Sequence, residues 1–108
     1  MRGDHLGEFE QRVLLTLLRL GADAYSVPIV RELEKRTGRE VQAAAVYIAL
    51  RRLEERGLVR SVLRDPGEAG GRQRRHFLLT PKAKKRLRDA HETYMRLAEG
   101  LEPLLEDA

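Results

Sequence analysis

The chain has 108 residues, 42% of them hydrophobic and 35% charged, which fits a single globular domain. It contains no cysteine, so disulfides, cysteine-ligated metal sites and thiol nucleophiles are excluded. The longest apolar run, Val13 to Leu18, is far shorter than the roughly 20 residues that cross a bilayer, and the N-terminus has no apolar signal segment. We therefore expect a soluble cytoplasmic protein.

The net charge of +4 is unevenly distributed along the sequence. Residues 1–50 carry seven basic and seven acidic side chains, residues 51–91 carry thirteen and five, and residues 92–108 carry one and five. The middle segment is therefore strongly basic and the C-terminal segment acidic. Two interpretations of the basic segment stay open, a binding site for a polyanion or an ordinary solvated surface.

The first part of the sequence predicts two helices. Apolar residues three and four positions apart predict a helix that ends before Gly21. Its apolar positions are Leu6, Phe9, Val13, Leu14, Leu17, Leu18 and Leu20. A second helix is expected after Ser26, its predicted N-cap, with Pro28 in the first turn and an end at Thr37-Gly38. The residues expected on its buried side are Val27, Val30 and Leu33.

A third helix is predicted over about residues 42–56, and Gly57 closes it. Its expected core residues are Val46, Ala49, Leu50 and Leu53. On the opposite side, at steps of four residues, lie Ala43, Tyr47 and Arg51. Two helices joined by a short glycine-containing connection are typical of a helix-turn-helix, although any helical hairpin can share the pattern.

A β-hairpin is predicted after the third helix. β-Branched residues in 58–63 and a second run over 72–79 are separated by the turn residues Asp65-Pro66-Gly67 and Gly70-Gly71. The element order is then helix, helix, helix, hairpin and helix. The fold class predicted is mainly α with a small β-hairpin (α+β).

The second run of the hairpin is rich in arginine. In an extended chain Arg72 and Arg74 share one face, and Arg75 lies on the other with Phe77. The two preceding glycines leave the tip free to adapt to a phosphate backbone or a minor groove. The alternative is an edge strand that its charges protect against aggregation.

The last helix is expected to begin at Thr80-Pro81, an N-cap followed by proline at the first helical position. A heptad seam follows, with apolar residues at alternating steps of four and three. Its members are Ala83, Leu87, Ala90, Tyr94, Leu97, Leu101 and Leu104. The seam favours contact with a second chain, and packing on the first helix of the same chain is the alternative. Gly100 and Pro103 predict that the regular helix ends or bends near Gly100.

Catalytic and metal-binding patterns are missing from the sequence. His5, His76 and His91 are isolated from one another, and no nucleophile has a base at a useful spacing. The glycines at 67, 70 and 71 precede a basic strand instead of a helix, so they do not form a nucleotide-phosphate loop. We expect no enzyme activity, no cofactor and no metal.

Several motifs in the same order resemble the PadR-like transcriptional regulators. They are residues 6–10, 13–18, 24–29, Val46-Tyr47 with Leu50, 52–59, Gly71-Arg72, Arg75-His76-Phe77 and Leu79-Thr80-Pro81. The resemblance covers about residues 6 to 90. It implies a winged helix-turn-helix DNA-binding domain over residues 1–80, a C-terminal dimerisation helix and acidic tail over 81–108, homodimers, and a repressor role at promoter operators.

The pattern and the resemblance together give two sets of candidate site residues. The expected DNA-binding residues are Tyr25, Gln42, Ala43, Ala44, Tyr47, Arg51, Arg72, Arg74 and Arg75. The expected dimerisation residues are Leu6, Phe9, Val13, Leu87, Ala90, Tyr94, Leu97 and Leu101. Recognition residues 42–56 are expected in the major groove and a basic wing, about residues 65–75, on the backbone or minor groove.

Each recognition side chain has a chemical role in this hypothesis. Gln42 can pair with adenine or donate to phosphate, and Arg51 can reach phosphate or guanine. The Tyr47 hydroxyl suits a phosphate oxygen, unless its ring only packs on the surface. Lys82 and Lys85 are the further phosphate contacts expected on the last helix.

The expected partners are double-stranded DNA with a pseudo-palindromic operator and a second copy of the chain. A small-molecule effector of unknown identity stays open, in an apolar pocket lined by Phe9, Val13 and Tyr94 that a dimer joined by its first and last helices can enclose. The rival hypothesis is a winged-helix adaptor that docks its basic hairpin on an acidic protein without binding DNA. A Tyr47 and Arg51 stripe on the same side as a basic wing favours DNA.

Overall fold

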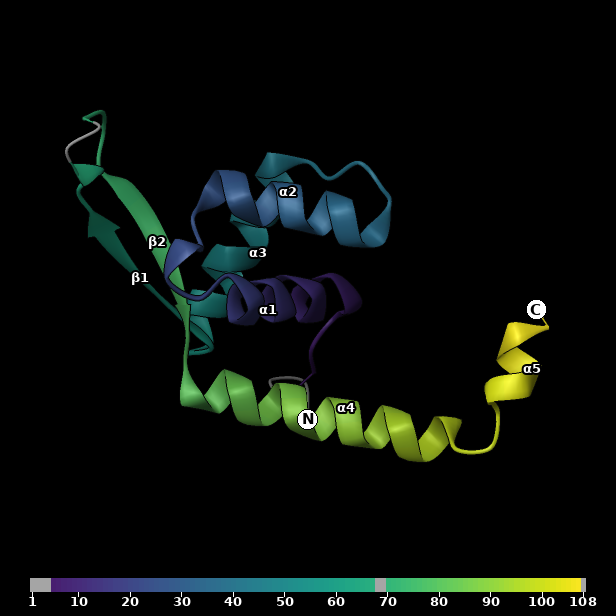
Figure 1. Ribbon diagram of the computed structural model, residues 1–108. Helices are drawn as coiled ribbons and strands as arrows, with labels where there is room; N and C mark the ends of the chain where they lie inside the picture. Colours follow the sequence, from purple (N-terminus) through teal and green to yellow (C-terminus); the bar gives the residue numbers. More distant parts are fainter. Residues whose placement is uncertain (1–4, 68–69, 108) are drawn as a thin grey trace.

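The computed structural model describes residues 5–67 and 70–107, with its elements in the order that the sequence predicts (Figure 1). They are α1 (Glu8–Leu20), the 3-10 turn η2 (Gly21–Asp23), α2 (Ser26–Thr37), α3 (Ala43–Glu55), β1 (Val59–Arg64), β2 (Arg74–Leu79), α4 (Pro81–Ala98) and α5 (Glu102–Glu106). The fold class, mainly α with a small hairpin, is confirmed. The start of the expected first domain, two residues of the expected wing and the end of the acidic tail lie outside the described residues.

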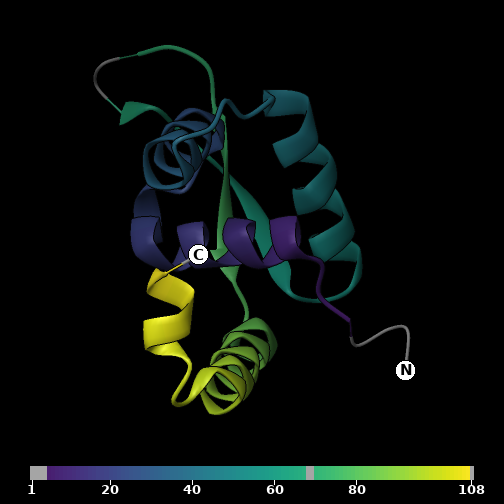
Figure 2. The same ribbon diagram turned by 90° about the vertical axis from the view of Figure 1, so that its right-hand side faces the viewer.

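Helix α1 is the centre of the fold. It packs against α2, α3, β2 and α4, and it lies between α4 and the pair α2 and α3 (Figures 1 and 2). Val13, Leu14 and Leu17 are buried in it because positions three and four apart share one face of a helix. The wider core is Leu6, Val13, Leu14, Leu17, Ala24, Ile29, Leu33, Val46, Ala49, Leu50, Leu53, Leu58, Val59, Phe77, Ala83 and Leu87.

Helix α2 begins one residue earlier than predicted. Ser26 is already helical and Tyr25 is the N-cap, without a side-chain capping bond, so the expected Ser26 N-cap is wrong. The buried residues are Ile29 and Leu33, whereas Val27 is half exposed. Val27 lies two positions before Ile29, which corresponds to a rotation of about 200° around the helix. Its side chain therefore points away from the core.

The two strands pair antiparallel from Val59 opposite Leu79 to Arg64 opposite Arg74. The Phe77 amide donates a hydrogen bond to the Ala24 carbonyl (2.9 Å), and the Phe77 ring is buried. The hairpin is therefore fixed to the start of α2. Each strand begins later than expected, and β2 starts at Arg74, which leaves Arg72 outside it. The expected pairing of Arg72 and Arg74 on one strand face is therefore wrong.

Helix α4 begins as the sequence predicts and ends where expected. The Thr80 side chain accepts a hydrogen bond from the Ala83 amide (3.3 Å), and the helix ends at Ala98, two residues before Gly100. Gly100 has φ +81°, a left-handed conformation that favours glycine, so the chain turns there into α5. Residues 91–107, here called the C-terminal arm, comprise the last turns of α4 and α5, and α5 stands apart from the other helices (Figure 1).

The heptad seam of the last helix divides into two halves. Ala83 and Leu87 are buried, and α4 contacts α1 of the same chain, as the intramolecular alternative required. From Tyr94 onward the seam is exposed: 62% of Tyr94, 74% of Leu97 and 43% of Leu101 is accessible. Only this second half is left for another chain.

Candidate nucleic-acid interface

The outer side of α3 carries the predicted stripe. Because Val46, Ala49, Leu50 and Leu53 are buried beneath it, Ala43, Tyr47 and Arg51 are exposed on the other side, as the spacing predicted. The Arg51 guanidinium carbon lies 6.0 Å from the centre of the Tyr47 ring, and Arg51 Nη1 donates to the Tyr47 hydroxyl (3.5 Å). The two side chains therefore contact each other along the exposed side of α3.

The first turn of α3 is open to solvent. Gln42 is the N-cap, with extended backbone (φ −80°, ψ 128°) and no side-chain capping bond. Its exposed amide is therefore available to an external partner. Ala43 and Ala44 are small and exposed, so a large ligand can approach the backbone here. The N-terminal end of a helix also favours negative charge.

Tyr25 joins the hairpin to the start of α2. The Arg74 guanidinium lies 4.6 Å from the centre of the Tyr25 ring, and the His76 ring lies 5.2 Å from it at a tilt of 46°. His76 Nδ1 is 2.8 Å from the Ala22 carbonyl oxygen. Arg74 and His76 are two positions apart on β2, so they share one face of the strand, and Phe77 lies on the other. Cation–π contact thus positions Arg74 next to α2.

Arg75 is on the other face of β2 and has a partner within the chain. Arg75 Nη1 donates to the Ser61 hydroxyl (3.0 Å), and Ser61 donates to Glu54 at the end of α3 (2.8 Å). This chain of bonds ties the hairpin to α3. Arg72 is exposed in the loop before β2, where no strand fixes its direction.

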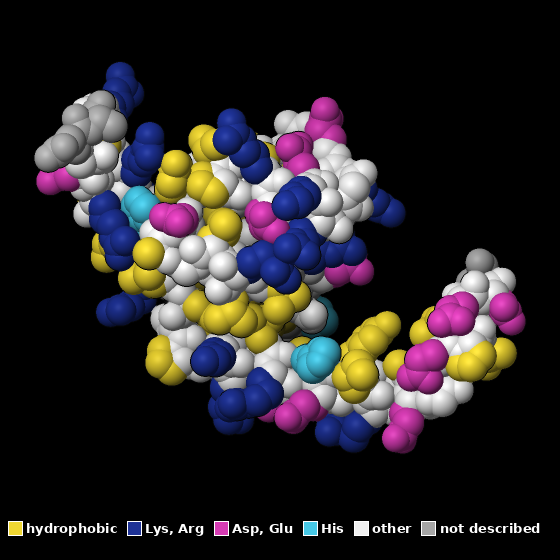
Figure 3. Space-filling model, in the orientation of Figure 1, with side chains coloured by type: hydrophobic (Ala, Val, Ile, Leu, Met, Phe, Trp, Pro, Cys, Tyr) yellow, Lys and Arg dark blue, Asp and Glu magenta, His cyan; other side chains and the backbone are white. Residues whose placement is uncertain are grey.

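A hollow of about 490 Å³ lies between the hairpin, α2 and α3. It brings together four predicted site residues, Tyr25, Tyr47, Arg74 and Arg75, with Val27 and Phe77 in its wall. We call these four residues and Arg51 the α3–hairpin surface. Lys and Arg side chains are prominent over the hairpin and the body, whereas most of the charged side chains over α5 are Asp or Glu and lie among hydrophobic ones (Figure 3).

The lysines expected to contact phosphate have partners within the chain. Lys82 Nζ donates to the Arg56 carbonyl oxygen (3.2 Å), and Lys85 forms an ion pair with Asp89 (3.3 Å) on α4. Both side chains are exposed. Neither lines the hollow beside α3.

The residues expected at the dimer contact fall into two groups. Leu6, Val13 and Leu87 are buried in the core of their own chain, and Phe9 is partly buried against it. Val13, with no exposed area, has nothing to offer a second chain or an effector. Phe9 and Tyr94 line different hollows. Val13 therefore cannot line the pocket expected in the dimer, which corrects that part of the expectation, and a pocket between Phe9 and Tyr94 of two chains stays a prediction.

Sequence reasoning found the exposed stripe but missed what holds the hairpin. Tyr25 entered only through the resemblance, and its contact with Arg74 joins residues far apart in sequence. The Arg75, Ser61 and Glu54 chain was missed for the same reason, and the sequence offers no signal for either. Alternation along the strand did predict that Arg75 lies with Phe77.

Comparison with known proteins agrees with this geometry. The family model described as "Transcriptional regulator PadR-like family" matches residues 14–89. The chain belongs to this family. It is a DNA-binding transcriptional regulator and not an enzyme.

Solved structures share the fold of this PadR-like regulator. A PadR family transcription regulator from hypervirulent Clostridium difficile R20291 has a TM-score of 0.76 at 21% identity, over 92% of this chain and 99% of that one. A PadR family transcriptional regulator from Eggerthella lenta DSM 2243 has a TM-score of 0.63 at 28% identity, over 93% of this chain and 89% of that one. The complex structure of hsRosR-SG has a TM-score of 0.73 at 25% identity, over 99% of this chain and 95% of that one. No curated protein matches the chain.

Two further structural findings concern the described residues of the PadR-like regulator. Among them, no group of three or more His, Cys, Asp or Glu side chains is placed to hold a metal ion. Within residues 5–67 and 70–107, none of the helices combines the length with the hydropathy of a membrane-spanning segment.

Proposed function

We propose that the protein represses transcription by binding a pseudo-palindromic operator as a homodimer. Residues 1–80 form the DNA-binding domain and residues 81–108 the dimerisation helix and acidic tail. The observation that carries the proposal is the α3–hairpin surface, where the exposed stripe of α3 and the arginines of β2 border one hollow.

Helix α3 enters the major groove with its N-terminal turn nearest the bases. The small Ala43 and Ala44 allow close approach, and the Gln42 amide pairs with adenine or donates to phosphate. Arg51, two turns further on, reaches guanine or phosphate, and the Tyr47 hydroxyl donates to a phosphate oxygen. Binding breaks the long Arg51 to Tyr47 hydrogen bond, which at 3.5 Å is easily exchanged.

The hairpin contacts the backbone or the minor groove next to the site of α3. Arg74 is positioned by Tyr25, and the exposed Arg72 can follow the phosphates because no strand fixes it. Arg75 keeps its bond to Ser61 and acts chiefly by its charge. The basic excess of residues 51–91 adds a long-range attraction to the polyanion.

The homodimer forms through the exposed half of the heptad seam. Tyr94, Leu97 and Leu101 are apolar seam residues that a lone chain leaves exposed, and a second chain can bury them. A twofold pair presents its recognition helices to successive major grooves, which lie about 34–36 Å apart. The dimer bound over a promoter excludes other proteins from it, which is repression.

A salt titration of binding to the DNA upstream of the protein's own gene tests the proposal. Fluorescence anisotropy should show affinity falling steeply with salt, with a log–log slope of about −0.9 for each neutralised phosphate. A scrambled duplex of the same length is the control for sequence preference. Affinity that does not change with salt, or no binding in dilute buffer, would contradict DNA binding by this surface.

A further inference from the structure

One exposed apolar residue of α3 has no part in the DNA contacts proposed above. Ile48 follows Tyr47 in the helix, and 51% of its surface is accessible. Helix propensity does not explain an isoleucine at this place, because alanine, leucine, lysine and glutamate are all better helix formers. Single apolar residues are common on protein surfaces, so the direction and the neighbours of Ile48 decide whether it has a function.

The buried residues of α3 define which side of the helix faces outward. With a rotation of about 100° for each residue, Tyr47 lies about 110° from the mean direction of the buried residues, whereas Ile48 lies about 150° from it. Ala44, one turn before Ile48, lies about 170° from the same direction. Ala44 and Ile48 therefore point away from the core, and Tyr47 points sideways into the hollow beside the hairpin.

Two exposed arginines lie one turn beyond Ile48. Arg51 is three positions after it and Arg52 four, so both are its neighbours on the helix surface. Figure 2 shows α3 (teal, on the right) at one edge of the fold, and Ile48 also borders an open hollow of about 670 Å³ beside the start of α1. A polyanion that contacts Arg51 therefore lies next to an apolar side chain.

The chemistry of an isoleucine side chain limits what it can recognise on DNA. It has no hydrogen-bond donor or acceptor, so it can bind neither a phosphate nor the polar edge of a base. The apolar group that the major groove presents is the C5 methyl of thymine, and removing this methyl and Ile48 from water together is favourable. A cytosine in the same place offers no methyl, and contact with Ile48 would desolvate its polar edge without a hydrogen bond.

We propose that Ile48, with Ala44 one turn before it, contacts the C5 methyl group of a thymine in each half of the operator. The inference rests on the proposed function, because α3 must enter the major groove for this contact to form. It makes Ile48 a specificity-determining residue beside Arg51, which makes polar contacts to a base or phosphate. In the proposed homodimer, the two Ile48 side chains require two thymines related by the operator's twofold symmetry.

Deoxyuridine in place of thymine tests the contact, because it removes the C5 methyl group and leaves the base pairing unchanged. Duplexes from the DNA upstream of the protein's own gene, each with one symmetric pair of thymines replaced, are titrated with the natural chain by fluorescence anisotropy. At one pair of positions the affinity should fall about tenfold, since each lost methyl contact corresponds to about a fourfold loss. Replacement of the other thymines should leave the affinity unchanged and is the internal control.

The same titrations separate this inference from the proposed function. A natural duplex that binds, with no pair of thymines sensitive to deoxyuridine, overturns the methyl contact and leaves DNA binding by α3 intact. A natural duplex that does not bind in dilute buffer overturns both. Because this scan uses the natural chain, it does not depend on the folding of any variant.

Variants of α3 then assign the methyl contact to one residue. Ile48→Ala should bind the natural duplex about tenfold more weakly and should no longer distinguish it from the sensitive deoxyuridine duplex. Arg51→Ala is the matched control: it also weakens binding, but it should keep the tenfold difference between the two duplexes because Ile48 is still present. A full difference in Ile48→Ala would mean that another residue contacts the methyl group, which overturns the proposal.

The melting temperature checks that the variants fold. Ile48→Ala should not lower it, because the isoleucine is half exposed and alanine has the higher helix propensity. Ile48→Val is the more conservative change, since it is shorter by one methylene and keeps the branched shape. It should reduce the difference between the two duplexes to a few-fold, and an unchanged difference would also overturn the proposal.

Discussion

The α3–hairpin surface and the C-terminal arm are both exposed, but they are supported differently. Beneath the first lie the buried side chains of Val46, Leu50 and Phe77, so its tyrosines and arginines stand on a packed core. In the arm, residues 91–107, no residue is buried. The α3–hairpin surface is therefore preformed in the single chain, whereas the leucines of the arm are covered only in the homodimer that we propose.

The largest expected effect is on the arm. Leu97→Asp should raise the dimer dissociation constant about 100-fold or more, because a buried leucine contributes about 1.5–3 kcal/mol and a dimer loses two of them. Sedimentation equilibrium measures this. Arg96→Asp, one position outside the seam, is the control. If Leu97→Asp instead lowered the melting temperature of a chain that was already monomeric, the arm would not be a contact for a partner.

Next in size is a change on the α3–hairpin surface. Arg51→Ala should weaken operator binding about tenfold, since a good bidentate base contact contributes about 1–3 kcal/mol. The dimer and the melting temperature should not change, because Arg51 is exposed and its hydrogen bond within the described residues is the long one to Tyr47. Arg88→Ala, an exposed arginine on α4, is the control in the same anisotropy titration. Unchanged affinity in Arg51→Ala would mean that α3 faces elsewhere.

A smaller effect is expected where the hairpin meets α2. Tyr25→Leu should weaken operator binding about threefold, since a cation–π contact at an exposed site contributes about 0.5–1 kcal/mol and here positions Arg74. Tyr25→Phe keeps the ring and should bind almost as the natural chain does. If both variants lost affinity equally, the Tyr25 hydroxyl and not the ring would be the important group.

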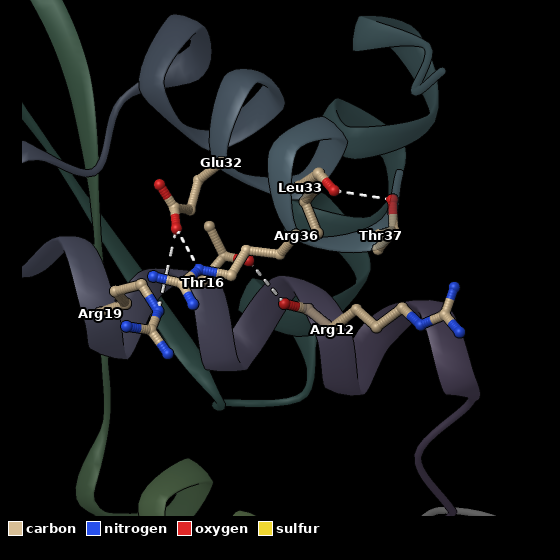
Figure 4. Close-up of polar contacts among 7 residues, drawn as sticks. All are labelled: Arg12, Thr16, Arg19, Glu32, Leu33, Arg36 and Thr37. Atoms are coloured by element: carbon tan, nitrogen blue, oxygen red, sulfur yellow. Dashed lines mark hydrogen bonds and ion pairs between the residues drawn. The ribbon is translucent and has the colours of Figure 1, made fainter. Parts of the chain in front are cut away.

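The smallest effect concerns Glu32 of α2, whose carboxylate lies 2.7 Å from Arg36 Nε and 3.9 Å from Arg19 Nε of α1 (Figure 4). The hydrogen bond from Arg36 lowers the pKa of Glu32 below its ordinary value. A lowered folded-state pKa adds stability above the ordinary pKa, and this is lost as the pH falls through the folded value. The melting temperature should therefore fall slightly more between neutral pH and about pH 3 in the natural chain than in Glu32→Gln. Identical curves of melting temperature against pH for the natural chain and Glu32→Gln would contradict this contribution of Glu32 to stability.

Periodicity predicted most of the fold because it reports which side of an element is apolar. The four core residues of α3, the Thr80 cap of α4 and the end of α4 near Gly100 were all predicted correctly. The start of α2 was wrong by one residue, which exchanged Val27 for Ile29 in the core. A short helix with several apolar residues offers more than one stripe, and only packing chooses between them.

The candidate site was predicted in its exposed residues and not in its contacts. Helical spacing alone gave Tyr47 and Arg51 on one side, whereas the contact of Tyr25 with Arg74 and the bond of Arg75 to Ser61 needed the folded chain. These pairs join residues 49 and 14 positions apart, and no local pattern records such a distance.

The sequence by itself determined the order of elements, the basic middle, the acidic end and the existence of a heptad seam, because these depend on composition and on the repeat of a helix. Tertiary structure decided how the seam is shared. Ala83 and Leu87 are buried where α4 packs on α1, while Tyr94 and Leu97 border a hollow beside His5 and Leu6 and stay largely exposed. An apolar stripe shows that a helix needs a partner, but only the position of neighbouring elements shows whether its own chain supplies one.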